Sequence, residues 1–225
     1  MKKVLKVLAA IALVIAIVFI GYLETGHYNA DERAAEYVAT NENDNYITYD
    51  KGSNVGFIFY PGGKVESSAY SYLSEIDANV YIAKFPFELA MFDYDIADEV
   101  ITDNPQVDTW YIGGHSLGGV FANRFAVNNQ ELFSGVVFLG SYPAEGDDST
   151  LPGLAFFGDQ DLVVGDYNEQ LSKFGQSTEV EILTNGNHSG FGNYGQQKGD
   201  SELSTDLLIA QQEKIVEDIN NFIKQ

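Results

Sequence analysis

The feature that most constrains the fold is a series of short apolar runs separated by segments with helical spacing. The run VGFIFY over Val55–Tyr60 is continuously apolar, and Pro61-Gly62-Gly63 ends it. Such a run is typical of a strand buried on both faces of a parallel sheet. Further short runs predict strands at Asn79–Ala83, Thr109–Ile112, Gly135–Gly140 and Gly153–Phe157. A strand is also predicted at Glu179–Leu183, and the alternation in Tyr46–Tyr49 predicts a short edge strand.

The segments between these runs carry apolar residues at the three- and four-residue spacing of a helix. They predict helices at Ser68–Ile76, Ala90–Asp103, Val120–Asn128, Tyr167–Phe174 and within Glu202–Ile223. Strands that alternate with helices predict an α/β fold, with a mostly parallel, doubly wound sheet that has helices on both faces. Because no repeat or low-complexity linker divides residues 46–225, we expect them to form one domain.

The N-terminus differs from the rest of the chain. Lys2, Lys3 and Lys6 flank the start of an apolar run that reaches Leu23 and is long enough to cross a bilayer as a helix. With the lysines on the cytoplasmic side, residues 1–24 predict a single-pass membrane anchor and an extracytoplasmic domain. The alternative is a cleaved signal peptide and a secreted protein. Residues 25–45 are polar and acidic and predict a spacer.

Composition excludes several function classes. The chain has 33 acidic and 12 basic residues, a net charge of -21, which argues against nucleic acid as a partner. It has no cysteine, so a disulfide and a thiolate nucleophile are both excluded. Its three histidines lack the spacing of paired zinc ligands, and we expect neither a metal nor a cofactor.

The strongest chemical signal is Gly114-His115-Ser116-Leu117-Gly118, which has the pattern G-x-S-x-G. It lies between a predicted strand and a predicted helix, the context required by a sharp turn that presents a nucleophilic serine. Glycines at the flanking positions leave room where a side chain would meet the neighbouring strand and helix. We therefore predict Ser116 as a nucleophile. The alternative is a glycine-rich turn with an exposed serine.

A serine nucleophile needs a base and an acid that orients the base. His188 lies on the loop after the last predicted strand and is the candidate base, whereas His115 is expected to point away from Ser116. Asp161 and Asp159 both follow the strand Gly153–Phe157, and we favour Asp161 because Leu162-Val163-Val164 can hold it in place.

The oxyanion of an acyl-transfer intermediate needs two backbone N–H donors. The residue after the nucleophile, Leu117, supplies one. The second is expected from the loop after Val55–Tyr60, with Gly63 as the first candidate and Gly62 as the next. The alternative for Pro61-Gly62-Gly63 is a plain turn.

With these residues in view, the chain resembles the α/β-hydrolase superfamily. It looks closest to the compact bacterial group labelled α/β-hydrolase fold-5, which is loosely related to dienelactone hydrolases. The resemblance is carried by FIFYPGGKVE, IGGHSLGG, FFGDQDLVV and GNHSGFGNYGQQKGD. It implies catalytic positions at Ser116, Asp161 and His188. Dienelactone hydrolases use a cysteine nucleophile, which this chain lacks.

The resemblance also bears on the entrance to the site. Many relatives insert a cap domain after the strand that ends near Gly140, but Ser141–Pro152 is too short for one, so we expect an open site. Its candidate rim residues are Tyr60, Tyr142, Phe191 and Tyr194, although aromatic residues at these positions could equally belong to the core.

These observations together predict a serine hydrolase that cleaves an ester through an acyl-enzyme, acting on a small-molecule ester or an acylated component of the cell envelope. One alternative is another acyl transfer, or amide or thioester hydrolysis, on the same residues. Another is a non-catalytic binding module that keeps the hydrolase fold.

Overall fold

The computed structural model describes residues 25–144 and 149–225, together with Leu13 and Gly21. The predicted membrane anchor over residues 1–24 therefore lies almost wholly outside the described residues. Among the residues that are described, no helix is long and apolar enough to span a bilayer.

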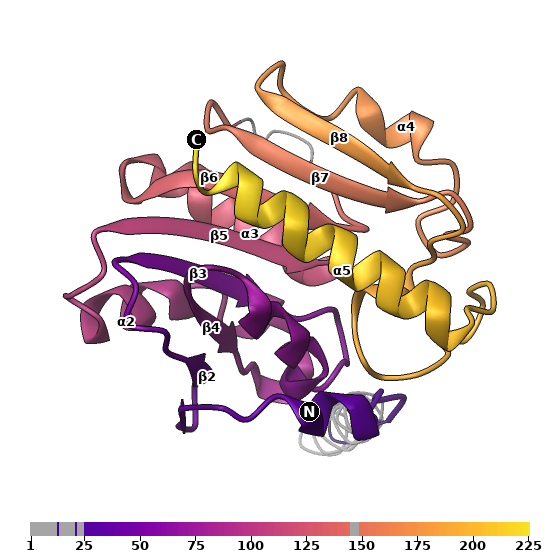
Figure 1. Cartoon of the computed structure of the whole chain (residues 1–225), viewed down its shortest axis with the longest axis horizontal. Coiled ribbons are helices and arrows are strands. Elements are labelled where there is room, and N and C mark those ends of the chain that lie inside the picture. Colours follow the sequence, from indigo (N-terminus) through magenta and orange to yellow (C-terminus); the bar gives the residue numbers. More distant parts are fainter. Residues whose placement is uncertain (1–12, 14–20, 22–24, 145–148) are drawn as a thin grey trace, which may run out of the picture.

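An eight-stranded sheet forms the centre of the domain, in the order β1-β2-β4-β3-β5-β6-β7-β8 (Figure 1). Neighbouring strands from β4 to β8 are parallel, whereas β1 and β2 are antiparallel to their neighbours. The strands are β1 Asn41–Glu42, β2 Tyr46–Tyr49, β3 Val55–Tyr60, β4 Asn79–Ala83, β5 Thr109–His115, β6 Phe133–Leu139, β7 Gly153–Gly158 and β8 Thr178–Leu183. The prediction of a mostly parallel α/β sheet is confirmed.

Helices cover both faces of the sheet because its strands bury apolar side chains on both sides. The longest helix, α5 (Thr205–Phe222), crosses one face in Figure 1, and η2 (Ser67–Glu75) packs against the same core. Helices α2 (Ile96–Asp103) and α3 (Leu117–Asn128) pack against the other core. The remaining elements are η1 Glu32–Glu36, η3 Pro86–Glu88, η4 Ala90–Phe92, η5 Gln130–Leu132, α4 Asn168–Leu171 and η6 Ser189–Phe191.

Three predicted elements differ from the structure. Tyr46–Tyr49 is not an edge strand, because β1 pairs outside it and all four residues are buried. The helix predicted over Ala90–Asp103 is two elements, η4 and α2, separated at Asp93–Asp95. Ser68–Ile76 forms a 3₁₀ helix, whose tighter turn the apolar spacing does not distinguish from an α-helix.

Residues 25–45 are part of the folded domain rather than a separate spacer. Tyr28 forms a parallel bridge with Val65, and the N–H of Asp31 donates to the carbonyl of Asn193 at 2.8 Å. The hydroxyl of Ser71 donates to the carbonyl of Ala34 at 2.9 Å. These contacts pair backbone groups from distant parts of the chain, which a polar sequence without periodicity does not reveal.

Candidate active site

The turn between β5 and α3 has the strained geometry that its sequence predicts. Ser116 has φ 50° and ψ −123°, a conformation that non-glycine residues rarely adopt. The flanking glycines are required by space, since a Cβ on Gly118 would lie 2.2 Å from the carbonyl oxygens of Tyr60 and Pro61. Ser116 is half-buried at the carboxyl end of β5, at the start of α3. The positive N-terminal end of that helix favours negative charge near the serine.

The structure brings His188 and Asp161 together. The Nδ1 of His188 and the Oδ2 of Asp161 are 2.8 Å apart, and both side chains are buried. The other carboxylate oxygen accepts the N–H groups of Val163 at 2.9 Å and Val164 at 2.8 Å. These bonds hold the carboxylate in a fixed orientation against the imidazole. Asp159, the competing residue, is exposed and instead accepts the N–H of Asn185.

The end of β6 connects Ser116 to the histidine. The N–H of Ser116 donates to the carbonyl of Leu139 at 3.0 Å. The next residue, Gly140, has φ 50°, and a Cβ there would lie 3.0 Å from Nδ1 of His188. The Nε2 of His188 is buried and forms no hydrogen bond to any described residue, Ser116 included. When Nδ1 donates to Asp161, Nε2 carries the lone pair of a base, and such a bond to a nucleophile is often long before substrate binds.

The two residues predicted to supply backbone donors for an oxyanion are neighbours in the structure. A Cβ on Gly63 would lie 3.2 Å from the side chain of Leu117. Over the described ranges, the N–H groups of Gly63 and Leu117 have no intramolecular acceptor. The N–H of Gly62, the second candidate, donates instead to the hydroxyl of Tyr70 at 3.0 Å. Gly63 and Leu117 are therefore the pair left available for a ligand.

One arrangement near the site was missed by the sequence reasoning. His115 lies with its ring centroid 4.5 Å from that of His188, and its Nδ1 is 2.8 Å from the hydroxyl of Tyr70. Because this hydroxyl accepts from Gly62, its proton is free to donate to His115. Burial, with a smaller contribution from His188, holds the pKa of His115 well below its usual range. A neutral His115 thus links the Gly62 loop to the candidate base. The sequence pattern indicates a packing or hydrogen-bonding residue that points away from Ser116, but not which residues it contacts.

Three of the predicted rim residues are in the core. Tyr60 and Phe191 are fully buried, and Tyr194 is 6% exposed. The hydroxyl of Tyr60 donates to the carbonyl of Tyr94, which fixes its ring below the surface. Tyr142 remains half-buried, with the Lys173 ammonium 3.7 Å from its ring centroid. For Tyr60, Phe191 and Tyr194, the core alternative describes the structure.

Comparison with known proteins shows the family to which the chain belongs. Residues 56–213, more than two thirds of the chain, match the model of the alpha/beta hydrolase family. A curated relative, the pimeloyl-[acyl-carrier protein] methyl ester esterase of Photorhabdus laumondii, is 35% identical over 89 residues. That match covers 40% of this chain and 31% of the relative, so the chain spans about a third of the relative's length.

Solved structures share the fold at low sequence identity. The dienelactone hydrolase of Anabaena variabilis has a TM-score of 0.57 and 19% identity, over 80% of this chain and 94% of that one. An alpha-beta serine hydrolase homologue from Coxiella burnetii has a TM-score of 0.59 and 16% identity, over 81% and 99% of the two chains. The family match extends from β3 into α5 and contains Ser116, Asp161 and His188, and the chain belongs to the alpha/beta hydrolase family.

Proposed function

We propose that the protein is a serine esterase with Ser116 as nucleophile, His188 as general base and Asp161 as the acid that orients it. The observation that carries this proposal is the strained backbone of Ser116 together with the buried hydrogen bond between His188 and Asp161. A strained backbone at a non-glycine residue is costly, and so is the burial of an imidazole–carboxylate pair. Nucleophilic catalysis supplies a reason for both.

The first half-reaction forms an acyl-enzyme. Ser116 Oγ attacks the carbonyl carbon of the ester while His188 Nε2 takes its proton, and the carbonyl oxygen becomes an oxyanion facing the N–H groups of Gly63 and Leu117. Asp161 stabilises the imidazolium through Nδ1. The tetrahedral intermediate then collapses: the bond to the alcohol oxygen breaks, and His188 gives its proton to that oxygen.

The second half-reaction repeats these steps with water. His188 takes a proton from water, the hydroxide attacks the acyl carbon, and the acid leaves as the proton returns to Ser116 Oγ. His115 stays neutral because its pKa is held low, so it does not compete for the proton or repel the imidazolium. No metal takes part in this scheme.

Ester cleavage is favoured over the other acyl transfers by one comparison. The name of the Photorhabdus relative describes a methyl ester esterase, and its match to this chain is at 35% identity. Amide or thioester hydrolysis, or transfer to an alcohol, would use the same residues and differ only in the leaving or accepting group. A non-catalytic binding module would leave the strained serine without a role.

We also propose that the domain acts outside the cell membrane, tethered by residues 1–24. The support is the sequence, in which lysines precede an apolar run of membrane-spanning length. In the structure, the Lys64 ammonium donates to the carbonyl of Thr25 at 2.6 Å, beside Gly63. A tether that ends at residue 24 would therefore hold the oxyanion loop on the membrane-facing side.

A small chromogenic ester tests the proposed chemistry. We expect the full chain to hydrolyse p-nitrophenyl acetate, and Ser116→Ala and His188→Ala each to lose at least about 10³-fold in kcat/KM. Ser172→Ala is the matched control, because Ser172 is exposed at the C-terminal end of α4 and its hydroxyl contacts only the carbonyl of Glu169, at 3.5 Å. Folded Ser116→Ala that keeps full activity would remove Ser116 from the mechanism.

A further inference from the structure

The segment that follows β4 presents three large apolar side chains to solvent. Phe87 is 38% exposed, Met91 53% and Phe92 44%, and we call these three residues the 87–92 patch. The ring centroids of Phe87 and Phe92 are 5.8 Å apart, so the exposed rings are gathered rather than scattered. Clustered apolar surface of this kind marks a binding site more often than isolated exposed residues do.

The backbone of this segment is strained in a way that exposes the patch. Phe87 and Glu88 have φ values of 56° and 54°, in the left-handed region that disfavours side chains. The neighbours on either side, Phe85 and Leu89, turn inward and are buried. The N–H of Lys64 donates to the carbonyl of Glu88 at 2.7 Å and helps hold the turn. Two strained residues in succession are typical of segments kept for ligand contact.

The segment that carries the patch also packs against the proposed oxyanion loop. The side chain of Leu89 approaches a Cβ placed on Gly63 to 3.5 Å, and that of Leu117 approaches it to 3.2 Å. Leu89 belongs to the same segment as the patch, and η4, which contains Met91 and Phe92, packs against α3. An acyl group on Ser116 would therefore find apolar surface directly beyond Gly63.

The order of the strands decides which part of an ester lies on this side. Ser116 follows β5, and the segment with the patch follows β4, two strands away in one direction. Asp161 and His188 follow β7 and β8, in the opposite direction (Figure 1). Because His188 must protonate the departing alcohol, the alcohol lies on the β7–β8 side. The acyl chain then extends over the β4 side.

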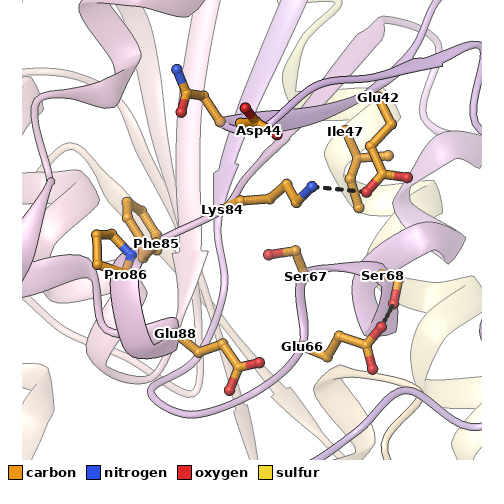
Figure 2. Close-up of a pocket in the computed structure, with 11 residues that line it drawn as sticks. Glu42, Asp44, Ile47, Glu66, Ser67, Ser68, Lys84, Phe85, Pro86 and Glu88 are labelled. Carbon is orange, nitrogen blue, oxygen red and sulfur yellow. Dashed lines mark hydrogen bonds and ion pairs between the residues drawn. The ribbon is translucent and has the colours of Figure 1, made fainter. Parts of the chain in front are cut away.

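The charge around this segment selects against an acidic chain. Figure 2 shows a hollow beside the 85–88 turn; it has a volume of about 400 Å³, and its lining includes Glu42, Asp44, Glu66 and Glu88. Lys84, the basic residue in this hollow, is paired with Glu42 at 2.8 Å. A carboxylate at the end of an acyl chain would be repelled here.

From these observations we infer that the 87–92 patch binds the acyl chain of the ester, and that this chain is an uncharged aliphatic chain longer than acetyl. The inference rests on the proposed function. Each methylene that leaves water against apolar surface adds to transition-state binding, so kcat/KM rises with acyl length until the patch is covered.

The test compares p-nitrophenyl acetate with p-nitrophenyl octanoate, in the full chain and in the triple variant Phe87→Ser/Met91→Ser/Phe92→Ser. We expect the octanoate-to-acetate ratio of kcat/KM to fall at least about 10-fold in the triple variant. Ile209→Ser is the matched control, since Ile209 is 43% exposed on α5, and its ratio should equal that of the parent. If the triple variant does not fold, the same ratio of kcat/KM is measured in Met91→Ser alone, where it should also fall.

A second pair of substrates separates the acyl side from the alcohol side. Octyl acetate carries the long chain on the alcohol, and its kcat/KM relative to p-nitrophenyl acetate should be the same in parent and triple variant. An unchanged octanoate ratio in the folded triple variant would overturn the inference, as would a fall for octyl acetate instead. A parent that hydrolyses acetate but not octanoate would overturn it while leaving the esterase proposal intact. A parent inactive on every ester would remove both.

Discussion

Replacement of Asp161 by asparagine tests how the carboxylate acts on His188. In the parent, Oδ2 of Asp161 faces Nδ1 of His188 at 2.8 Å, while Oδ1 accepts the N–H groups of Val163 and Val164. Asparagine can keep its oxygen on the two N–H groups only by pointing its NH₂ at Nδ1. The imidazole must then carry its proton on Nε2, where the base needs a lone pair.

The magnitude follows from this change of tautomer. We expect Asp161→Asn to lower kcat/KM by about 10³- to 10⁴-fold, or about 4 to 5.5 kcal/mol. Stability should change much less, because the bonds from Val163 and Val164 lose only their charge-assisted part, about 1 to 2 kcal/mol in total. In a domain of this size that corresponds to a melting temperature lower by about 2 to 8 °C.

Asp159→Asn is the control for this experiment, because Asp159 precedes Asp161 by two residues but is exposed and contacts Asn185 instead. The assay measures p-nitrophenyl acetate hydrolysis and thermal unfolding for the parent and both variants. Activity of Asp161→Asn within about 5-fold of the parent, or an equal loss in Asp159→Asn, would refute the assignment of the acid.

Two further predictions concern stability. Gly118→Ala places a Cβ 2.2 Å from the carbonyl oxygens of Tyr60 and Pro61. These backbone atoms cannot move aside as a side chain would, so the melting temperature should fall by at least about 5 °C. The control variant Gly175→Ala, with no contact closer than 3.4 Å, should change the melting temperature little. His115 has a lowered pKa in the folded state, so below about pH 6.5 the unfolded chain binds a proton that the folded chain does not, and stability falls as pH falls. Denaturant titrations measure the free energy of unfolding at pH 6 and pH 5. Between these two values it should fall by about 1 kcal/mol more in the parent than in His115→Gln. An equal fall in both proteins would show that His115 takes up its proton in the folded state.

Most of the sheet could be predicted because its strands are buried on both faces. Val55–Tyr60, Asn79–Ala83 and Tyr46–Tyr49 have the predicted bounds, since a turn signal stands at each end of a continuous or alternating apolar run. β5 runs three residues further than predicted, to His115, because the glycines that precede the serine continue the strand. Local patterns identify such elements but not their tertiary partners. The position of β1 at the edge and the packing of Tyr28 beside Val65 therefore could not be read from the sequence.

The candidate site shows the same division between local and tertiary information. The strain at Ser116 and the need for Gly118 are consequences of the local turn, and the motif predicts them. The apolar residues that follow Asp161 favour it over Asp159, and in the structure Asp161 is the aspartate that lies 2.8 Å from Nδ1 of His188. The contacts of His115 with Tyr70 and His188 join strand β5 to helix η2 and to the loop before η6, which are far apart in the sequence. The burial of Tyr60 and Phe191 depends on side-chain direction, so no local pattern indicates either feature.

The central claim is that Ser116 is an activated nucleophile, and the most direct measurement is its reaction with a fluorophosphonate followed by peptide mapping with mass spectrometry. This reaction needs no knowledge of the substrate, because it depends only on a serine whose proton a base can take. We predict one adduct, on the peptide that contains Ser116, and at least about 100-fold slower labelling in folded His188→Ala. An adduct on another serine, or no adduct on folded parent protein, would contradict the account.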